Sequence, residues 1–225
     1  MDAALKEADR AISELRFRAV EIFTDISGKP VDSPEFVPLY EKMEGYNLPV
    51  FLHPRRPNTV PDYPGEVASK YLTFTNFGWP YETSKAMARL AFGGVFDQCP
   101  NLKVITHHAG GMIPFFSKRI ELSWDFNEMR MGYRVEKPLC KAPLDYYRMF
   151  FCDTAIQGNT PALMCAYHFF GAEHMLFATD MPYDNQLGER VYRETISAIE
   201  EMAISDTEKK KIFEDNARKL LRLPV

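Results

Sequence analysis

Histidine and aspartate side chains follow four short apolar runs of the sequence, each near the point where the run ends. These residues are His53, the pair His107 and His108, Asp153 and Asp180. Imidazole nitrogens and carboxylate oxygens are ligands of divalent metal ions such as zinc, and both can move protons near neutral pH. If these side chains share one site, they suit metal-assisted acid–base chemistry.

His53 has two interpretations that the residues alone leave equally open. It lies in the stretch Phe51–Pro54, and Pro54 ends the apolar run because it has no backbone N–H to donate. A neutral imidazole at such a turn is a good ligand for zinc. The other interpretation is a histidine at the end of a strand that is bonded only to a backbone carbonyl.

Asp180 also has two interpretations. An aspartate after an apolar run often caps the helix that follows. The next residues, Met181 and Pro182, instead indicate a defined turn that holds the carboxylate at the site. Asp153 has a similar position in the sequence with weaker support.

His107 and His108 precede Ala109, Gly110 and Gly111. The glycines allow the backbone to approach a ligand closely, and the helix predicted to follow would favour an anion at its N-terminus. Successive residues of a strand point to opposite sides. We therefore expect one histidine to face the site and the other to face the surrounding helices.

Five apolar runs predict the strands that position these residues, at 18–24, 48–53, 102–107, 148–152 and 174–178. Mostly apolar strands are typical of a parallel sheet covered on both faces. Amphipathic stretches between them, such as residues 3–15 and the helix opened by the capping box Ser205–Glu208, predict helices. The alternation indicates an α/β fold, in which functional sites lie at the carboxyl ends of the strands.

Three side chains near the proline-rich loop 56–80 are candidates for binding a substrate: Arg55, Trp79 and Glu82. Arg55, like the adjacent Arg56, could clamp a carboxylate, although loop arginines are more often solvated or paired with surface acids. A tryptophan can line a pocket for a planar molecule, although aromatic residues at this density usually pack in the core.

Other chemically suggestive residues are assigned to the framework. His168 and His174 flank the end of a predicted helix and are expected to be structural. Met129, Met131 and Met149 are expected in the core.

Composition narrows the classes of function. The chain has 225 residues, 46% hydrophobic content and a net charge of −4, which predict one globular domain over residues 1–225 and no nucleic-acid or membrane partner. Four separated cysteines and an N-terminus without a signal-peptide pattern favour reduced thiols and a cytoplasmic location.

Several motifs together resemble a known family. The stretches FLHP, KVITHHAGG followed by MIPFF, FATDMP and DNARKLL, with WPYET, are similar to the amidohydrolase-related branch that contains aminocarboxymuconate-semialdehyde decarboxylase and γ-resorcylate decarboxylase. The resemblance runs from about residue 3 to the C-terminus. It implies a TIM-type (β/α) barrel that binds one divalent metal ion, commonly Zn²⁺.

On this resemblance, His53 and Asp180 are metal ligands from barrel strands five and eight. His108 and Asp180 are the catalytic residues that move protons, and His107 points away from the site. The implied substrate is a small carboxylated aromatic or dienoic acid, which is decarboxylated or hydrolysed.

The sequence departs from the family pattern in one respect. Family members begin with a strand that carries an H-x-H or E-x-H motif. No H-x-H motif occurs in this sequence. About five βα units, corresponding to strands four to eight, predict an incomplete barrel with open sheet edges and a tendency to form homo-oligomers. A fragment or mis-assigned start, completion by a partner chain, and a remnant without catalysis are the three explanations.

Two classes of function therefore follow. The first is a metal-dependent decarboxylase or hydrolase of the amidohydrolase superfamily. The second is a non-catalytic partial barrel that oligomerises or binds a ligand. An open nucleotide-binding sheet ranks last, because no glycine-rich phosphate loop follows the first predicted strand.

Overall fold

The computed structural model describes residues 1–131 and 139–223, without the side chains of residues 128 and 131. Within this part of the chain, five parallel strands form one sheet in the order β1-β4-β5-β6-β7. Its strands are β1 (Val20–Phe23), β4 (Val50–His53), β5 (Val104–Thr106), β6 (Phe151–Asp153) and β7 (Met175–Leu176). A short antiparallel hairpin of β2 (Asp25–Ile26) and β3 (Lys29–Pro30) follows β1.

Each of the five predicted runs overlaps a strand, although the strands are shorter than the runs and β6 extends one residue beyond its run, to Asp153. Val50 of β4 pairs with Val20 of β1 on one side and with Val104 of β5 on the other. The prediction of an α/β fold with a parallel sheet is confirmed. Because all five strands run in one direction, their carboxyl ends meet at the same edge of the sheet.

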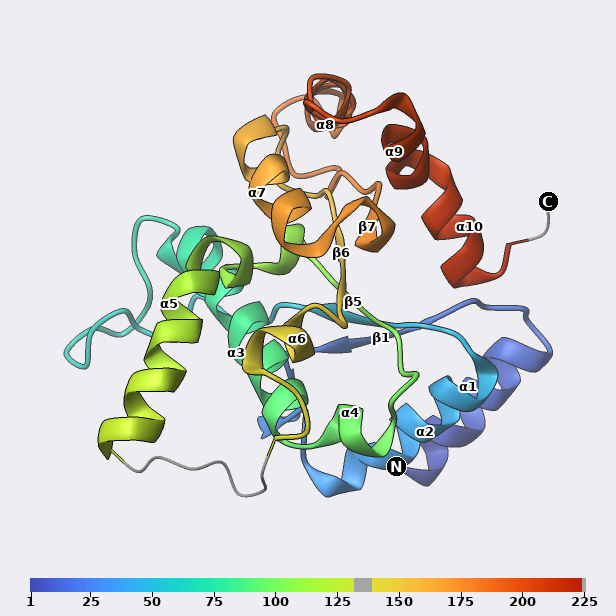
Figure 1. Cartoon of the computed structure of the whole chain (residues 1–225), viewed down its shortest axis with the longest axis vertical. Helices are drawn as coiled ribbons and strands as arrows, with labels where there is room; N and C mark the ends of the chain where they lie inside the picture. The colour runs from blue at the N-terminus through green and yellow to red at the C-terminus, as the bar shows by residue number, and fades with distance from the viewer. Residues whose placement is uncertain (132–138, 224–225) are drawn as a thin grey trace.

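Ten α-helices surround this sheet in the described part of the chain (Figure 1). They are α1 (Asp2–Ser13), α2 (Val37–Tyr46), α3 (Trp79–Phe92), α4 (Val95–Gln98), α5 (Ile113–Phe126), α6 (Pro143–Tyr147), α7 (Thr160–Phe170), α8 (Glu189–Glu200), α9 (Asp206–Lys210) and α10 (Asn216–Leu221). Figure 1 shows α1 and α2 at the lower right of the molecule and α8 and α9 at its top, with α10 between them on the right.

The two faces of the sheet are packed differently. Val50, Leu52 and Val104 belong to the large core that includes the helices α2, α3 and α7. Ile105, which points to the opposite face, forms a smaller cluster with Leu176 and Leu220. Alternation along the strands explains this division, since neighbouring residues face opposite sides.

Local signals predicted the helix starts well. Ser205 and Glu208 make both hydrogen bonds of the capping box at α9. The helix predicted at 3–15 is α1, which ends earlier, at Ser13, and leaves Leu15 48% exposed. Arg16 adopts a positive φ of 61°, so the chain leaves the helical direction directly after Leu15.

The structure corrects one expectation about the methionines. Met149 packs against the core, but Met129 is 74% exposed because it lies on the short π-helical turn η4 (Asn127–Met131) at the outer end of α5. The side chain of Met131 lies outside the described residues. His174 is structural as expected, since its Nδ1 bonds the carbonyl of Phe150 at 2.8 Å.

Two further observations concern the chain as a whole. All four cysteines are free thiols, and Cys99 and Cys152 are buried. Among the described residues, no helix is both long enough and apolar enough to cross a bilayer.

Asn216 ties the C-terminal helix to the sheet. Its buried side-chain amide donates to the carbonyls of Ala172 and Met175 at 2.7 and 2.8 Å. We expect Asn216→Ala to lower the free energy of unfolding by about 2 kcal/mol, because two buried carbonyls lose their donor. Urea denaturation followed by circular dichroism measures this. The exposed variant Lys219→Ala on the same helix is the control, and an equal loss in both variants would contradict the assignment.

Candidate active site

His53 stands at the carboxyl end of β4 with its ring half-buried. Its Nδ1 donates to the carbonyl of Pro54 at 2.9 Å, so Nε2 carries the free lone pair. Burial lowers the pKa of His53, and the neighbouring His107 lowers it further. A neutral imidazole with a fixed tautomer results, and this is the form that binds metal ions.

His107 lies beside His53 and does not point away from the site. The two ring centroids are 5.0 Å apart, and His107 Nδ1 donates to Asp153 Oδ2 at 2.7 Å. The prediction that His107 faces the surrounding helices is therefore wrong. Both histidines of the pair, and Asp153 with them, lie in the same cluster.

The backbone explains this correction. Strand β5 ends at Thr106, and the following residues leave the extended geometry on which alternation depends. His107 is still extended, but His108 and Ala109 adopt left-handed backbone angles with φ of 58° and 54°. Because alternation applies only within a strand, it does not govern a pair that begins after the strand has ended.

Asp153 is almost completely buried, and its carboxylate accepts three hydrogen bonds. Besides His107, the donors are the backbone N–H groups of Ala109 and Ala155 at 3.3 and 3.0 Å. Burial raises the pKa of Asp153, but the hydrogen bond and charge of His107 outweigh burial, so the pKa is lowered overall. The pKa of His107 is raised overall, because Asp153 outweighs the lowering effect of burial.

His108 and Asp180 form the other half of the cluster. His108 Nε2 lies 3.5 Å from Asp180 Oδ2, and the ring centroid of His108 lies 6.3 Å from that of His53. His108 is 8% exposed, and its Nδ1 is buried without a hydrogen-bond partner in the described part of the chain. The structure therefore places His108 next to both His53 and Asp180.

Asp180 lies in the loop after β7 with a positive φ of 61°. The backbone N–H groups of Gly188 and Val191, at the start of α8, are bound by Asp184 instead, at 3.1 and 2.8 Å. Asp184, and not Asp180, therefore binds the backbone at the start of α8. The carboxylate of Asp180 is left facing His108.

The three predicted substrate-binding residues have different surroundings. The ring of Trp79 lies 5.8 Å from His53 and 6.3 Å from His108, so it borders the cluster. Arg55 pairs with the surface acid Asp25 at 3.3 Å, which is the ordinary interpretation of this arginine. Glu82 is 7% exposed.

Glu82 and His107 each have a further charged neighbour, which is Arg56 for Glu82 and Glu21 for His107. Glu82 forms ion pairs with Lys85 and, at 3.6 Å, with Arg56, whose carbonyl also accepts the indole N–H of Trp79 at 3.2 Å. Glu21, on β1, lies 3.9 Å from His107 Nε2. The sequence analysis missed Glu21, which no motif marks, because only the fold brings it to His107.

The two glycines after Ala109 pack the turn tightly between helices. A Cβ atom at Gly111 would lie 2.7 Å from the carbonyl oxygen of Pro80 in α3, and one at Gly110 would lie 2.6 Å from the ring of Phe170 in α7. Both glycines also have positive φ values, which are 79° for Gly110 and 61° for Gly111. The turn that carries His108 is therefore held against both helices.

The donor atoms fit part of a metal site. The free Nε2 of His53, the buried unpartnered Nδ1 of His108 and the carboxylate of Asp180 are ligand types that bind divalent ions. Among the described residues, however, no group of three or more His, Cys, Asp or Glu side chains is arranged to hold a metal ion. These three donors suit part of a ligand set, but they are not arranged to complete it.

Sequence comparisons agree with the resemblance of the motifs. A protein-family model described as amidohydrolase matches residues 1–223. The 2-amino-3-carboxymuconate-6-semialdehyde decarboxylase of Dictyostelium discoideum is 30% identical and is matched over 99% of this chain and 58% of its own length. The gamma-resorcylate decarboxylase of Polaromonas sp. is 28% identical, over 99% of this chain and 67% of its own length. The chain thus spans about three fifths to two thirds of the length of these relatives.

Solved structures show the same relationship. A 2,6-dihydroxybenzoate decarboxylase in complex with 2,6-dihydroxybenzoate superposes with a TM-score of 0.79 at 26% identity, over 98% of this chain and 67% of the other. The 5-carboxyvanillate decarboxylase of Sphingomonas paucimobilis gives 0.78 at 25% identity, over 99% and 63%. A Polaromonas dihydroxybenzoic acid decarboxylase with bound manganese superposes with a TM-score of 0.78 at 24% identity, over 98% of this chain and 65% of the other. At this identity, the likeness concerns the fold alone.

The pair of His107 and Asp153 predicts a pH-dependent contribution to stability. The lowered pKa of Asp153 means that its contribution is present above the unfolded value and is lost as the pH falls. The raised pKa of His107 means that its contribution is present below the unfolded value and is lost as the pH rises. The pair therefore stabilises the fold most between about pH 4 and pH 6.5.

Asp153→Asn removes the charge while it keeps the shape of the side chain. We expect it to lower the free energy of unfolding by about 2 kcal/mol in that pH range, with a smaller loss at pH 9. Urea denaturation at several pH values measures the difference. The exposed variant Asp145→Asn is the control, and a loss that does not change with pH would show that the pair is not ionic.

Proposed function

Because the chain belongs to the amidohydrolase family, we propose that it acts as a metal-dependent decarboxylase of a small carboxylated aromatic or dienoic acid. The observation that carries the proposal is the position of His108 beside both His53 and Asp180 at the carboxyl ends of the strands. The names of the relatives support decarboxylation of such acids. No observation favours the alternative of a non-catalytic partial barrel.

We propose that His53, through Nε2, and Asp180 hold one divalent metal ion, with Zn²⁺ as the first candidate. When bound, the ion would stabilise negative charge on the substrate carboxylate and a neighbouring oxygen. Bound manganese in a related decarboxylase makes Mn²⁺ the second candidate. The remaining coordination positions would be filled by groups outside the described residues, because these residues contain no three-ligand group.

His108 is the proposed proton carrier. In decarboxylation, the bond from the carbon skeleton to the carboxylate breaks, its electron pair stays on the ring or diene carbon, and that carbon takes a proton. His108 Nε2 is suited to deliver this proton, since it lies 3.5 Å from the carboxylate of Asp180 at the proposed metal site. His107 is held by Asp153 and would present its Nε2 to the same space.

The substrate-binding proposals differ in their support. Trp79 borders both His53 and His108 and would stack on a planar acid. Arg55 would have to leave Asp25 in order to clamp a carboxylate. Glu82 is held by Lys85 and Arg56, which favours a role in positioning Arg56 over direct contact with the substrate.

We also propose that the sheet is an incomplete barrel of about five βα units, in a single cytoplasmic domain that self-associates. Strand β1 has a parallel neighbour, β4, on one side only in the described part of the chain. A groove of about 660 Å³ follows β1 and α1, and its lining includes the apolar residues Phe17, Phe23 and Ile26. Further strands placed there would cover this edge and could supply the missing ligands.

Removing the proton carrier tests the catalytic role. We expect His108→Asn to lower kcat/KM for decarboxylation by about 10²-fold or more, because general acid catalysis contributes on this scale. Release of carbon dioxide from a panel of hydroxybenzoic and dienoic acids, with Zn²⁺ or Mn²⁺ present, measures the rate. His168→Asn, which replaces an exposed histidine on α7, is the matched control. Ring-opened or hydrolysed products without carbon dioxide would refute decarboxylation.

Metal titration tests the ligand assignment separately from activity. We expect His53→Ala and Asp180→Ala each to weaken binding of ZnCl₂ or MnCl₂ by at least about tenfold, because each removes a donor to the ion. Isothermal titration calorimetry of the whole chain measures the affinity. His168→Ala should leave it unchanged. Equal affinity in all four proteins would exclude His53 and Asp180 as ligands.

A further inference from the structure

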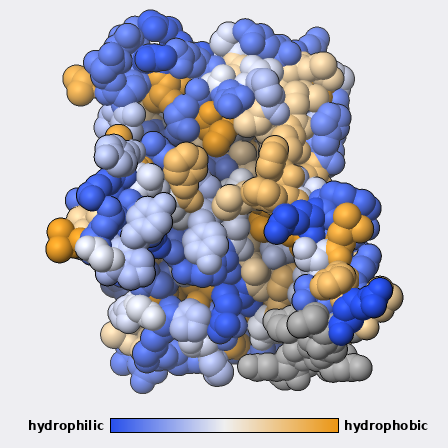
Figure 2. Space-filling model, turned by 90° about the vertical axis from the view of Figure 1, so that its left-hand side faces the viewer, coloured by the Kyte–Doolittle hydropathy of each residue, from blue (hydrophilic) through white to orange (hydrophobic). Residues whose placement is uncertain are grey.

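His107 carries a buried nitrogen atom that has no hydrogen-bond partner. Its Nε2 is shielded from water and bonds none of the described residues. An acidic oxygen, Oε2 of Glu21 on β1, lies 3.9 Å away, which is beyond hydrogen-bond length. Polar side chains at the surface, coloured blue in Figure 2, can bond water instead. A buried polar atom without a partner is rare in proteins, and a ligand or an ordered water that completes it is a common explanation.

The imidazole ring of His107 is not free to turn this nitrogen elsewhere. Its Nδ1 donates to the buried carboxylate of Asp153 at 2.7 Å, and the ring of Phe51 stacks on it with centroids 5.8 Å apart. Asp153 is itself held by two backbone N–H groups. The ring centroid of His107 lies 5.0 Å from that of His53 and 6.1 Å from that of His108. The unpartnered nitrogen therefore has a fixed direction and belongs to a residue of the candidate active site.

The charges around His107 determine which kind of group fits at Nε2. Asp153 is bonded to one side of the ring, and the carboxylate of Glu21 lies near the other side. These three side chains have a net negative charge even when His107 is protonated, so an anionic group of a ligand would be repelled there. A neutral hydroxyl group is not repelled.

A hydroxyl group also fits the distance between the two side chains. Because His107 Nε2 and Glu21 Oε2 are 3.9 Å apart, one hydroxyl oxygen can lie about 2.8 Å from both atoms. An O–H group accepts a hydrogen bond from a protonated Nε2 and donates one to a neutral Nε2. The hydroxyl group therefore binds His107 in either protonation state.

We propose that His107, through Nε2, and Glu21 bind a hydroxyl group of the substrate and so select hydroxylated acids over acids without this group. The proposal rests on the proposed function, because it concerns the acid that would bind at the same site. In the sheet, β1 and β5 lie on either side of β4. The hydroxyl group would thus be held across the strand that ends in His53, with Asp153 positioning the ring of His107.

Calorimetric titration of the whole chain with benzoate and the three monohydroxybenzoates, at saturating ZnCl₂, tests the proposal. We expect the wild-type chain to bind at least one hydroxybenzoate about tenfold more tightly than benzoate. The reason is that a site built for a hydroxyl group leaves its own buried polar atoms unpaired when the hydroxyl is missing.

Two variants separate the roles of the two ring nitrogens. His107→Asn places an amide N–H near the position of Nδ1, which keeps a donor to Asp153, but it has no atom at the position of Nε2. We expect this variant to fold, as circular dichroism checks, and to bind the preferred hydroxybenzoate no more tightly than benzoate. His107→Gln places its amide near the position of Nε2 and should retain part of the preference. His168→Asn, on α7, is the matched control and should keep all of it.

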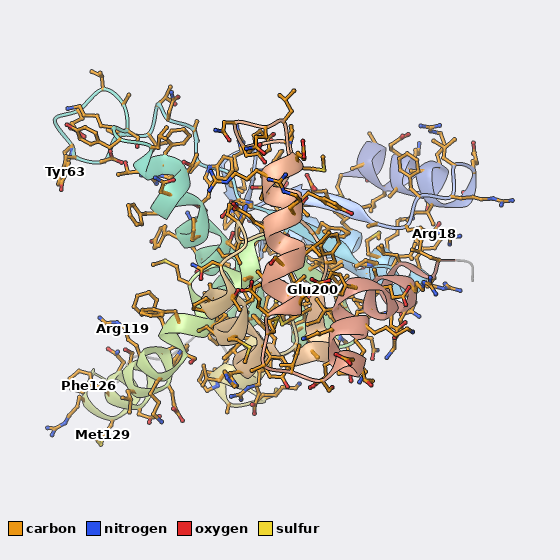
Figure 3. All side chains as sticks on the ribbon, turned by 90° about the horizontal axis from the view of Figure 1, so that it is seen from above. Arg18, Tyr63, Arg119, Phe126, Met129 and Glu200 are labelled. Atoms are coloured by element: carbon orange, nitrogen blue, oxygen red, sulfur yellow. The ribbon has the colours of Figure 1, made fainter. Side chains whose placement is uncertain are left out.

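Glu21→Ala tests the second contact without touching the buried pair of His107 and Asp153. The side chain of Glu21 is 56% exposed, so the variant should fold, and we expect it to reduce the preference by about threefold or more. Glu200→Ala, at the exposed end of α8 labelled in Figure 3, is the control and should bind all four acids like the wild type.

A wild-type chain without a preference for any hydroxybenzoate overturns the proposal. Preferences that all persist in both His107→Asn and Glu21→Ala overturn it as well, and would indicate that Nε2 bonds only an ordered water. Failure of the proposed function has a different signature. A hydroxyl preference that depends on His107, in a chain that releases no carbon dioxide from any of these acids, refutes decarboxylation and supports the hydroxyl site.

Discussion

The site depends on a single buried carboxylate, that of Asp153. A carboxylate is costly to remove from water unless its oxygens are bonded, and here His107, Ala109 and Ala155 supply the donors. Two of these donors belong to the segment that follows β5, and Asp153 itself ends β6. The carboxylate of Asp153 therefore joins the carboxyl ends of two neighbouring strands, β5 and β6. It also holds the left-handed turn that directs His108 toward Asp180.

This arrangement reconciles the two interpretations of His53. A histidine that bonds a backbone carbonyl and a histidine that binds a metal ion are compatible, because the two roles use different ring nitrogens. Pro54 fixes the proton on Nδ1, and the lowered pKa of His53 keeps the ring neutral. His107 is fixed in the same way by Asp153, but its raised pKa favours the charged form. The two neighbouring imidazoles therefore differ, because burial lowers the pKa of His53 whereas Asp153 raises the pKa of His107.

The sequence was sufficient to predict the parallel α/β fold and the gathering of His53, His108 and Asp180, because both depend on strand direction. Predictions failed where the outcome depends on tertiary neighbours. Alternation was applied to His107 although the strand had ended one residue before it. Met129 was assigned to the core because it is apolar, but exposure is set by the direction in which α5 leaves the molecule. The strands and the shared edge were predictable, whereas the partners of individual side chains were not.

The turn before α5 also fixes the start of this helix against its neighbours. Gly110 and Gly111 leave no room for a Cβ atom between Phe170 of α7 and Pro80 of α3, so the start of α5 is fixed inside one copy of the chain. The amide of Met112 is held in addition by Ser84 of α3 at 2.8 Å. The contacts that hold the turn carrying His108 therefore all come from one copy of the chain.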